Sequence, residues 1–169
     1  MNEYGMDYVR IRLDLEKHVM STHPITCPED AVDFLATQMK DLDREVIAVV
    51  HLASDGKPVH MTIASIGTLS EASASARELF KAAILSNANA VLIAHNHPSG
   101  SLHVSVPDVE MTKRMIECGK ILGIPVWDHV IIAGYTGAFL SLKQEHVCEF
   151  EQAASALSAA QSKDRYQTR

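Results

Sequence analysis

The clearest chemical signal in this chain is a pair of histidines, His95 and His97, followed a few residues later by Ser105 and Asp108. Residues two apart on a strand point to the same side, so both imidazoles can aim at one point. Asp108 lies early in a predicted helix and can fold back toward them. Two histidines and one carboxylate form a ligand set typical of catalytic zinc, with the fourth position left for water. The metal lowers the pKa of that water toward about 7. The pattern therefore predicts a hydrolytic zinc site, with the Ser105 hydroxyl beside it to stabilise an oxyanion or hold the water.

The same serine and aspartate also have a purely structural interpretation. Ser-x-x-Asp just before an apolar helical pattern is typical of a capping box, in which Ser105 is the N-cap and Asp108 bonds back to the backbone. On this interpretation Asp108 needs no metal, and histidines in exposed loops are common. The residue types alone leave both interpretations open.

The elements that must position these residues are indicated by hydrophobic periodicity. Asp55-Gly56 is a hairpin turn signal between two apolar runs, and Gly123 is a predicted helix C-cap. The sequence predicts strands over 46–52, 58–66, 90–94, 126–133 and 138–142 and helices from Pro28, over 75–85 and from near Ser105. This irregular order favours an α/β (α+β) sandwich, with a mixed sheet flanked by helices, over a doubly wound Rossmann fold.

The ends of the chain differ from its middle. Residues 8–14 alternate apolar and polar side chains, which predicts a strand within an N-terminal extension of residues 1–24. The predicted domain spans residues 25–145. Residues 146–169 begin with small residues and end in a polar stretch, which predicts a surface helix fading into a disordered tail.

Composition excludes several classes of protein. With 15 Lys and Arg against 21 Asp and Glu, the formal net charge is -6, which argues against direct binding to a nucleic-acid backbone. No apolar run approaches the roughly 20 residues of a membrane-spanning helix. The N-terminus lacks the pattern of a secretory signal. Three widely spaced cysteines do not suit a disulfide framework, so we expect a cytoplasmic protein.

The motif also resembles a known family. His95-x-His97-Pro98 followed by Ser105-x-x-Asp108 resembles the JAMM motif of the JAB/MPN metalloprotease superfamily. The stretches that resemble its bacterial RadC branch are Gly67-Thr68-Leu69, Arg77-Glu78, Ala82, Asn87-Ala88, Ala94 to Gly100 and Asp128-His129. The resemblance covers roughly residues 25–142. It implies a JAB/MPN-like (cytidine-deaminase-like) curved mixed sheet between helices, a three-layer sandwich.

The resemblance also implies a site and an activity. It makes His95, His97 and Asp108 the ligands of one zinc per chain, and Ser105 the catalytic serine. Relatives with intact sites cleave peptide or isopeptide bonds, often at ubiquitin-like modifiers, so we expect a peptide or isopeptide-linked protein substrate. The RadC name carries an association with DNA repair.

Two departures from the family pattern affect the predicted activity. JAMM enzymes use an upstream glutamate as general base, and here that position falls at Thr62 or Ile63. No acid lies between Asp55 and Glu71, and loss of a general base typically lowers the rate 10²–10⁴-fold. Either Glu71 or Glu78 is a possible substitute. RadC proteins also usually carry an N-terminal helical region, which the first 25 residues here do not resemble.

Two alternatives to a hydrolase follow. The chain can be a metal-binding interaction module with impaired catalysis, or an accessory protein associated with DNA repair. Among other residues, His129 either orients a ligand imidazole or makes a structural hydrogen bond, and His51 and His60 are placed to face each other across the first hairpin. Exposed edges of a mixed sheet would allow a homodimer.

Overall fold

The computed structural model describes residues 12–14, 16, 24–67 and 75–150. Within them the chain forms three helices and five strands. In chain order these are α1 (Pro28–Met39), β1 (Val46–Leu52), β2 (Pro58–Ile66), α2 (Ala76–Leu85), β3 (Ala90–His97), α3 (Val106–Leu122), β4 (Val126–Ala133) and β5 (Phe139–Ser141). None of the described helices combines the length and the apolar character needed to cross a membrane.

The sheet has the strand order β2-β1-β3-β4-β5 and is mixed. β3 and β4 run parallel, joined by α3, whereas β1 pairs antiparallel with both β2 and β3, and β5 pairs antiparallel with β4. The parallel pair in the middle requires a crossover, and α3 supplies it. Because α3 must return to the start of β4, its N-terminus lies near the carboxyl end of β3.

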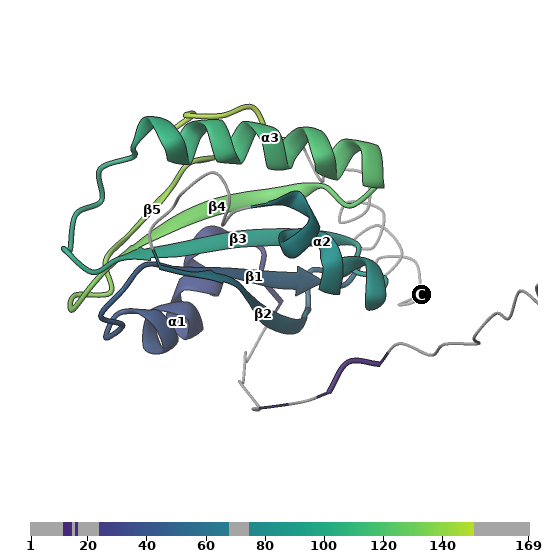
Figure 1. Cartoon of the computed structure of the whole chain (residues 1–169), viewed down its shortest axis with the longest axis horizontal. Helices are drawn as coiled ribbons and strands as arrows, with labels where there is room; N and C mark the ends of the chain where they lie inside the picture. Colours follow the sequence, from purple (N-terminus) through teal and green to yellow (C-terminus); the bar gives the residue numbers. More distant parts are fainter. Residues whose placement is uncertain (1–11, 15, 17–23, 68–74, 151–169) are drawn as a thin grey trace, which may run out of the picture.

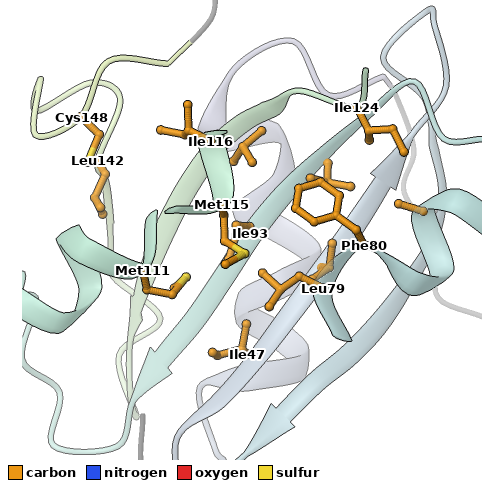
Figure 2. Packing of buried hydrophobic residues seen from close by; sticks show 14 of the residues in the cluster. Ile47, Leu79, Phe80, Ile93, Met111, Met115, Ile116, Ile124, Leu142 and Cys148 are labelled. Carbon is orange, nitrogen blue, oxygen red and sulfur yellow. The ribbon is translucent and has the colours of Figure 1, made fainter. Parts of the chain in front are cut away.

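Helices cover both faces of the sheet, as Figure 1 shows, which makes a three-layer α+β sandwich. α2 and α3 pack on one face over a buried cluster that includes Ile47, Phe80, Ile93 and Met115 (Figure 2). α1 packs on the other face over a second cluster, centred on residues such as Leu35 and the alternate side chains of β1 and β3. The predicted fold class is therefore confirmed.

The helix boundaries follow from local capping chemistry. Ser75 and Ser105 are the N-caps of α2 and α3, each accepting a hydrogen bond from the backbone N–H three residues on. Cys27 is the N-cap of α1, which has Pro28 in its first turn. Gly123 ends α3 in the left-handed conformation, with φ 68°. These ends agree with the sequence prediction.

Three predicted elements differ from the structure. The strand predicted to end at Ala94 continues to His97, because β3 pairs with β1 as far as His95 and with β4 as far as His97. The strand predicted over 138–142 is limited to Phe139–Ser141. Of the strand predicted over 8–14, residues 12–14 are exposed and belong to no strand, and the rest lies outside the described residues.

The C-terminal part of the described chain is attached to the core. Val147, Cys148 and Phe150 pack against the cluster under α2 and α3, so that packing continues past residue 145. The surface helix and tail predicted beyond them fall mainly on residues 151–169, which lie outside the described residues. On α3, Cys118 is only partly buried and Leu122 is 43% exposed, so the C-terminal end of this helix is less buried than its start.

Candidate metal centre

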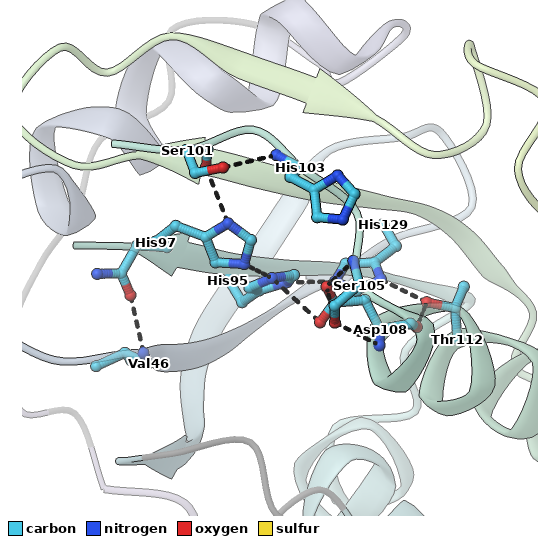
Figure 3. A network of polar contacts seen from close by, with 10 residues as sticks. Val46, His95, His97, Ser101, His103, Ser105, Asp108, Thr112 and His129 are labelled. Carbon is cyan, nitrogen blue, oxygen red and sulfur yellow. Dashed lines mark hydrogen bonds and ion pairs between the residues drawn. The ribbon is translucent and has the colours of Figure 1, made fainter. Parts of the chain in front are cut away.

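The candidate site lies where β3 ends and α3 begins. β3 contributes His95 and His97, two residues apart on the same face, and the first turn of α3 contributes Asp108 (Figure 3). His95 and Asp108 are 0% and 1% exposed, whereas His97 is half-buried. His97 is thus the most exposed of the three residues.

Three ligand atoms, one from each of these residues, lie within 4.8 Å of one another. The Nε2 atoms of His95 and His97 are 2.9 Å apart, and Asp108 Oδ1 is 3.5 Å from His95 Nε2. Asp108 Oδ1 is buried and has no hydrogen-bond partner. An unpartnered buried carboxylate oxygen is costly, and this group of atoms could hold a metal ion.

Asp108 also completes the capping box of α3. Its Oδ2 accepts hydrogen bonds from the Ser105 N–H at 2.8 Å and the Ser105 O–H at 2.6 Å. The Asp108 N–H donates in turn to Ser105 Oγ at 3.3 Å. The two interpretations of this motif are therefore compatible, because one carboxylate oxygen caps the helix and the other faces the histidines.

Each of the two candidate ligand imidazoles is held by a second contact at its Nδ1 atom. His97 Nδ1 lies 2.9 Å from the main-chain oxygen of Ser101, in the loop after β3. His95 Nδ1 lies 2.8 Å from Nε2 of His129, which comes from β4. His129 Nδ1 in turn lies 2.6 Å from the hydroxyl of Thr112 on α3 (Figure 3). Such outer contacts fix the orientation of metal-binding histidines.

Burial keeps the inner imidazoles uncharged at neutral pH. Loss of hydration lowers the pKa of His95 to about 4; the Asp108 carboxylate opposes this shift and His97 adds to it. Burial, with smaller contributions from His95 and His97, also holds the pKa of His129 well below its usual value. A neutral imidazole keeps the lone pair that a metal requires.

The backbone behind the site is fixed from two sides. Asn96, fully buried, accepts a hydrogen bond from the Val46 N–H at 2.8 Å and donates to the Arg44 carbonyl at 3.0 Å. Gly134, just after β4, donates its N–H to the His97 carbonyl at 2.8 Å. A Cβ atom at Gly134 would lie 2.9 Å from both the His97 and the Pro98 carbonyl oxygens. Only glycine allows this close approach.

The structure does not bring a second carboxylate to the described part of the site. Thr62 lies on the site face of the sheet, but its hydroxyl contacts His51 Nε2 at 2.9 Å. Ile63 is on the opposite face and 48% exposed. Glu78 forms an exposed ion pair with Lys81 at 2.6 Å. Glu71 lies outside the described residues.

The remaining predicted residues divide clearly. His129 contacts the candidate ligand His95, whereas Asp128 accepts a hydrogen bond from Ser141 Oγ at 2.6 Å and from the Lys143 N–H at 3.2 Å, and so has a structural role. His51 and His60 do face each other, with ring centroids 4.4 Å apart.

Sequence reasoning missed Thr112 altogether. Its spacing of four from Asp108 puts both residues on one face of α3, which was the available signal.

Comparison with known proteins gives one family. Residues 25–147 match the RadC-like JAB domain family. A UPF0758 protein of Caldanaerobacter subterraneus is 43% identical over 127 residues, which cover 75% of this chain and 54% of the relative. UPF0758 proteins of Staphylococcus carnosus and Desulfitobacterium hafniense are 42% and 35% identical, covering 64% and 82% of this chain and 48% and 63% of the relatives. The chain thus spans about half the length of the curated relatives it matches.

Proposed function

Since this chain belongs to the RadC-like JAB domain family, we propose that it is a zinc-dependent hydrolase that cleaves a peptide or isopeptide bond. The observation that carries the proposal is the convergence of three buried or half-buried ligand atoms, from His95, His97 and Asp108, within 4.8 Å. Two imidazole nitrogens and one carboxylate oxygen suit zinc, and three protein ligands leave a position for water. We expect one zinc per chain.

The residues present fit a cation on chemical grounds. Asp108 Oδ1 is the only described carboxylate oxygen that is buried without a hydrogen-bond partner; it lies 3.5 Å from His95 Nε2 and in one group with His97. When bound there, zinc supplies a Lewis acid and a water that deprotonates near neutral pH. The peptide carbonyl must approach past half-buried His97 and Ser105, because His95 and Asp108 are covered by the sheet and α3.

Ser105 is the residue proposed to stabilise the oxyanion of the substrate. In the structure its O–H donates to Asp108 Oδ2 at 2.6 Å. The hydroxyl must therefore turn away from Asp108 before it can donate to a substrate oxygen. Asp108 Oδ2 keeps the hydrogen bond from the Ser105 N–H during this rotation, so the carboxylate stays oriented.

One observation favours a second candidate, a metal-binding interaction module that has lost hydrolysis. At the positions where a general base is expected, Thr62 is engaged with His51 and Ile63 faces away from the site. Without a base, proton transfer from the attacking water loses a contribution of about 10²–10⁴-fold. The experiment must therefore separate metal binding from catalysis.

The test uses the full chain, loaded with zinc and freed of excess metal, against linear peptides and branched, isopeptide-linked peptides. If the protein is a hydrolase, it cleaves some of these peptides. Cleavage stops when a chelator removes the metal and returns when zinc is added back, and the Asp108→Ala variant is inactive. Stoichiometric zinc with no cleavage anywhere in the panel contradicts the hydrolase and supports the module.

One base-restoring variant and a matched control sharpen the choice. Thr62→Glu places a carboxylate on the site face of β2, and Ile63→Glu is the matched control on the opposite face. Gain of hydrolysis in Thr62→Glu alone identifies the missing base as the defect.

We also propose that the protein works in the cytoplasm. Cys27, Cys118 and Cys148 are free thiols, which supports a reducing compartment.

A further inference from the structure

A chain of short contacts links two of the proposed ligands through groups that are not ligands themselves. It runs from the Asp108 main-chain carbonyl to the Thr112 hydroxyl at 2.6 Å, on to His129 Nδ1 at 2.6 Å, and from His129 Nε2 to His95 Nδ1 at 2.8 Å. Figure 3 shows the chain crossing from α3 to β4 and β3. All four side chains are at most 1% exposed, so water does not compete for these contacts.

The chemistry of the groups fixes which atom donates and which accepts in each of these hydrogen bonds. A main-chain carbonyl can only accept, so the Thr112 O–H that bonds to Asp108 donates its single proton there. Thr112 Oγ1 then accepts at its other contact, which requires a proton on His129 Nδ1. A neutral His129 with Nδ1–H has its lone pair on Nε2 and accepts from His95 Nδ1–H. This leaves the lone pair of His95 on Nε2, the atom that faces His97 and Asp108.

Reversing every donor and acceptor in this series would put the proton of His95 on its other ring nitrogen. If the Thr112 hydroxyl donated to His129 instead, His129 Nε2–H would donate to His95, and His95 Nε2 would carry a proton. That proton would point at His97 Nε2, only 2.9 Å away, and would block His95 as a ligand. The hydrogen bond between Thr112 and the Asp108 carbonyl therefore decides whether His95 can bind a metal.

We propose that Thr112 and His129 are positioning residues that hold His95 as the Nδ1–H tautomer and so prepare the site before metal arrives. This inference rests on the proposed metal site. His97 is held in the same tautomer independently, since its Nδ1 contacts the Ser101 carbonyl, which also can only accept. Thr112 acts through α3, the helix that carries Asp108, so that one helix turn sets both the carboxylate and the tautomer of a histidine on β3.

The first test needs no metal. In the metal-free full chain labelled with ¹⁵N-histidine, two-bond ¹H–¹⁵N spectra report the tautomer of each neutral ring. We expect His95, His97 and His129 all as Nδ1–H. A proton on Nε2 of His95 or His129 overturns the proposal. This result does not depend on whether the protein is a hydrolase or binds zinc, so failure of the proposed function is distinguishable from failure of this inference.

The second test measures zinc affinity by competition with a chromophoric chelator, together with the visible spectrum of the Co²⁺-substituted protein. Loss of an outer contact of this kind typically weakens metal binding 10–100-fold. We expect that range for Thr112→Val, which keeps the shape and removes the hydroxyl, with a changed Co²⁺ spectrum. Thr112→Ser, which restores the hydroxyl, should return both to the wild-type values.

Thr62, on strand β2, provides a matched control for Thr112. Thr62 also contacts a buried histidine, His51, at 2.9 Å, but His51 is not a proposed ligand and contacts none of them, so Thr62→Val should leave zinc affinity unchanged. At His129, Gln offers a carbonyl to His95 and an amide to Thr112, whereas Met offers no comparable acceptor. We expect His129→Gln to bind zinc more tightly than His129→Met. Equal affinities in Thr112→Val and wild type, or an equal loss in Thr112→Ser, would contradict the proposal.

Discussion

At the scale of single residues, Asp108 shows how one side chain serves both the fold and the site. Oδ2 receives two hydrogen bonds from Ser105, and Oδ1 faces His95 without a hydrogen bond. The capping box therefore orients the carboxylate, because fixing Oδ2 against the helix end leaves Oδ1 only one direction. The capping box that starts α3 therefore also orients Asp108, a proposed metal ligand.

This division predicts different effects for two substitutions. Ser105→Ala removes the hydroxyl of the cap and should lower the free energy of unfolding by about 1 kcal/mol. It should keep about one zinc per chain, since the backbone N–H still holds Oδ2. Asp108→Asn should bind little zinc, because the amide either uses its oxygen for the cap or turns an N–H toward the metal.

Elemental analysis and urea unfolding of the zinc-free proteins measure the two effects separately. Loss of zinc in Ser105→Ala would show that the two oxygens do not act independently.

At the scale of elements, the site depends on how closely the turn after β4 approaches the end of β3. Gly134 donates to the His97 carbonyl, and the contact leaves no room for a side chain. The loop after β3 then turns through Gly100, whose N–H bonds to the same carbonyl. The position of His97 is thus set by a neighbouring strand as well as by its own.

Gly134→Ala tests this dependence. A Cβ atom 2.9 Å from two backbone oxygens must displace them, which should destabilise the protein by about 1–3 kcal/mol and weaken zinc binding. The control is Gly123→Ala, at the far end of α3. There φ is +68° and a Cβ meets nothing within 4 Å, so the left-handed conformation alone destabilises by about 1–2 kcal/mol.

Chelator competition on both variants separates stability from site geometry. We expect weaker zinc binding only in Gly134→Ala; the same weakening in Gly123→Ala would attribute it to lost stability.

At the scale of the whole molecule, the first hairpin carries a buried polar pair that the proposed mechanism does not use. His51 is 0% exposed, and its Nδ1 atom and Nε2 of His60 are buried without partners. Burial is the main cause that lowers the pKa of His51 to about 4, and the charge of the neighbouring His60 is the second cause. Burial also lowers the pKa of His60. The folded state therefore resists protonation at His51, whereas the unfolded chain accepts a proton near pH 6.5.

The sign of the pH dependence follows. Stability is fully present above pH 6.5 and is lost as the pH falls toward about 4, because the unfolded state binds the proton first. In His51→Phe, we expect the free energy of unfolding to fall by roughly 2–3 kcal/mol less than in the wild type over this pH range. Urea unfolding of the zinc-free proteins between pH 7 and pH 4 measures it.

The control is His146→Asn, an exposed histidine at φ 55°, a conformation that Asn tolerates, and it should keep the wild-type pH profile. An equally steep profile in His51→Phe would contradict the assignment to His51.

Local rules acting within a few residues of chain were enough to predict much of this protein. The Ser105 cap, Gly123, the Asp55-Gly56 turn and the apolar runs set the ends of α3 and the bounds of β1, β2 and β4 within the sequence. The spacing of His95 and His97 already allowed a common face, and Asp108 was placed in the first helical turn.

The contacts that decide the site come from residues far apart in sequence. β3 extends through its histidines because two other strands pair with it there. A shift in register between β1 and β2 puts Thr62 rather than Ile63 on the site face. The division of Asp108 between two roles, the approach of Gly134 and the chain from Thr112 through His129 depend on which elements become neighbours. Periodicity and capping are properties of one segment of the sequence. Strand register, and which elements lie side by side, are fixed only when the helices pack on the two faces of the sheet.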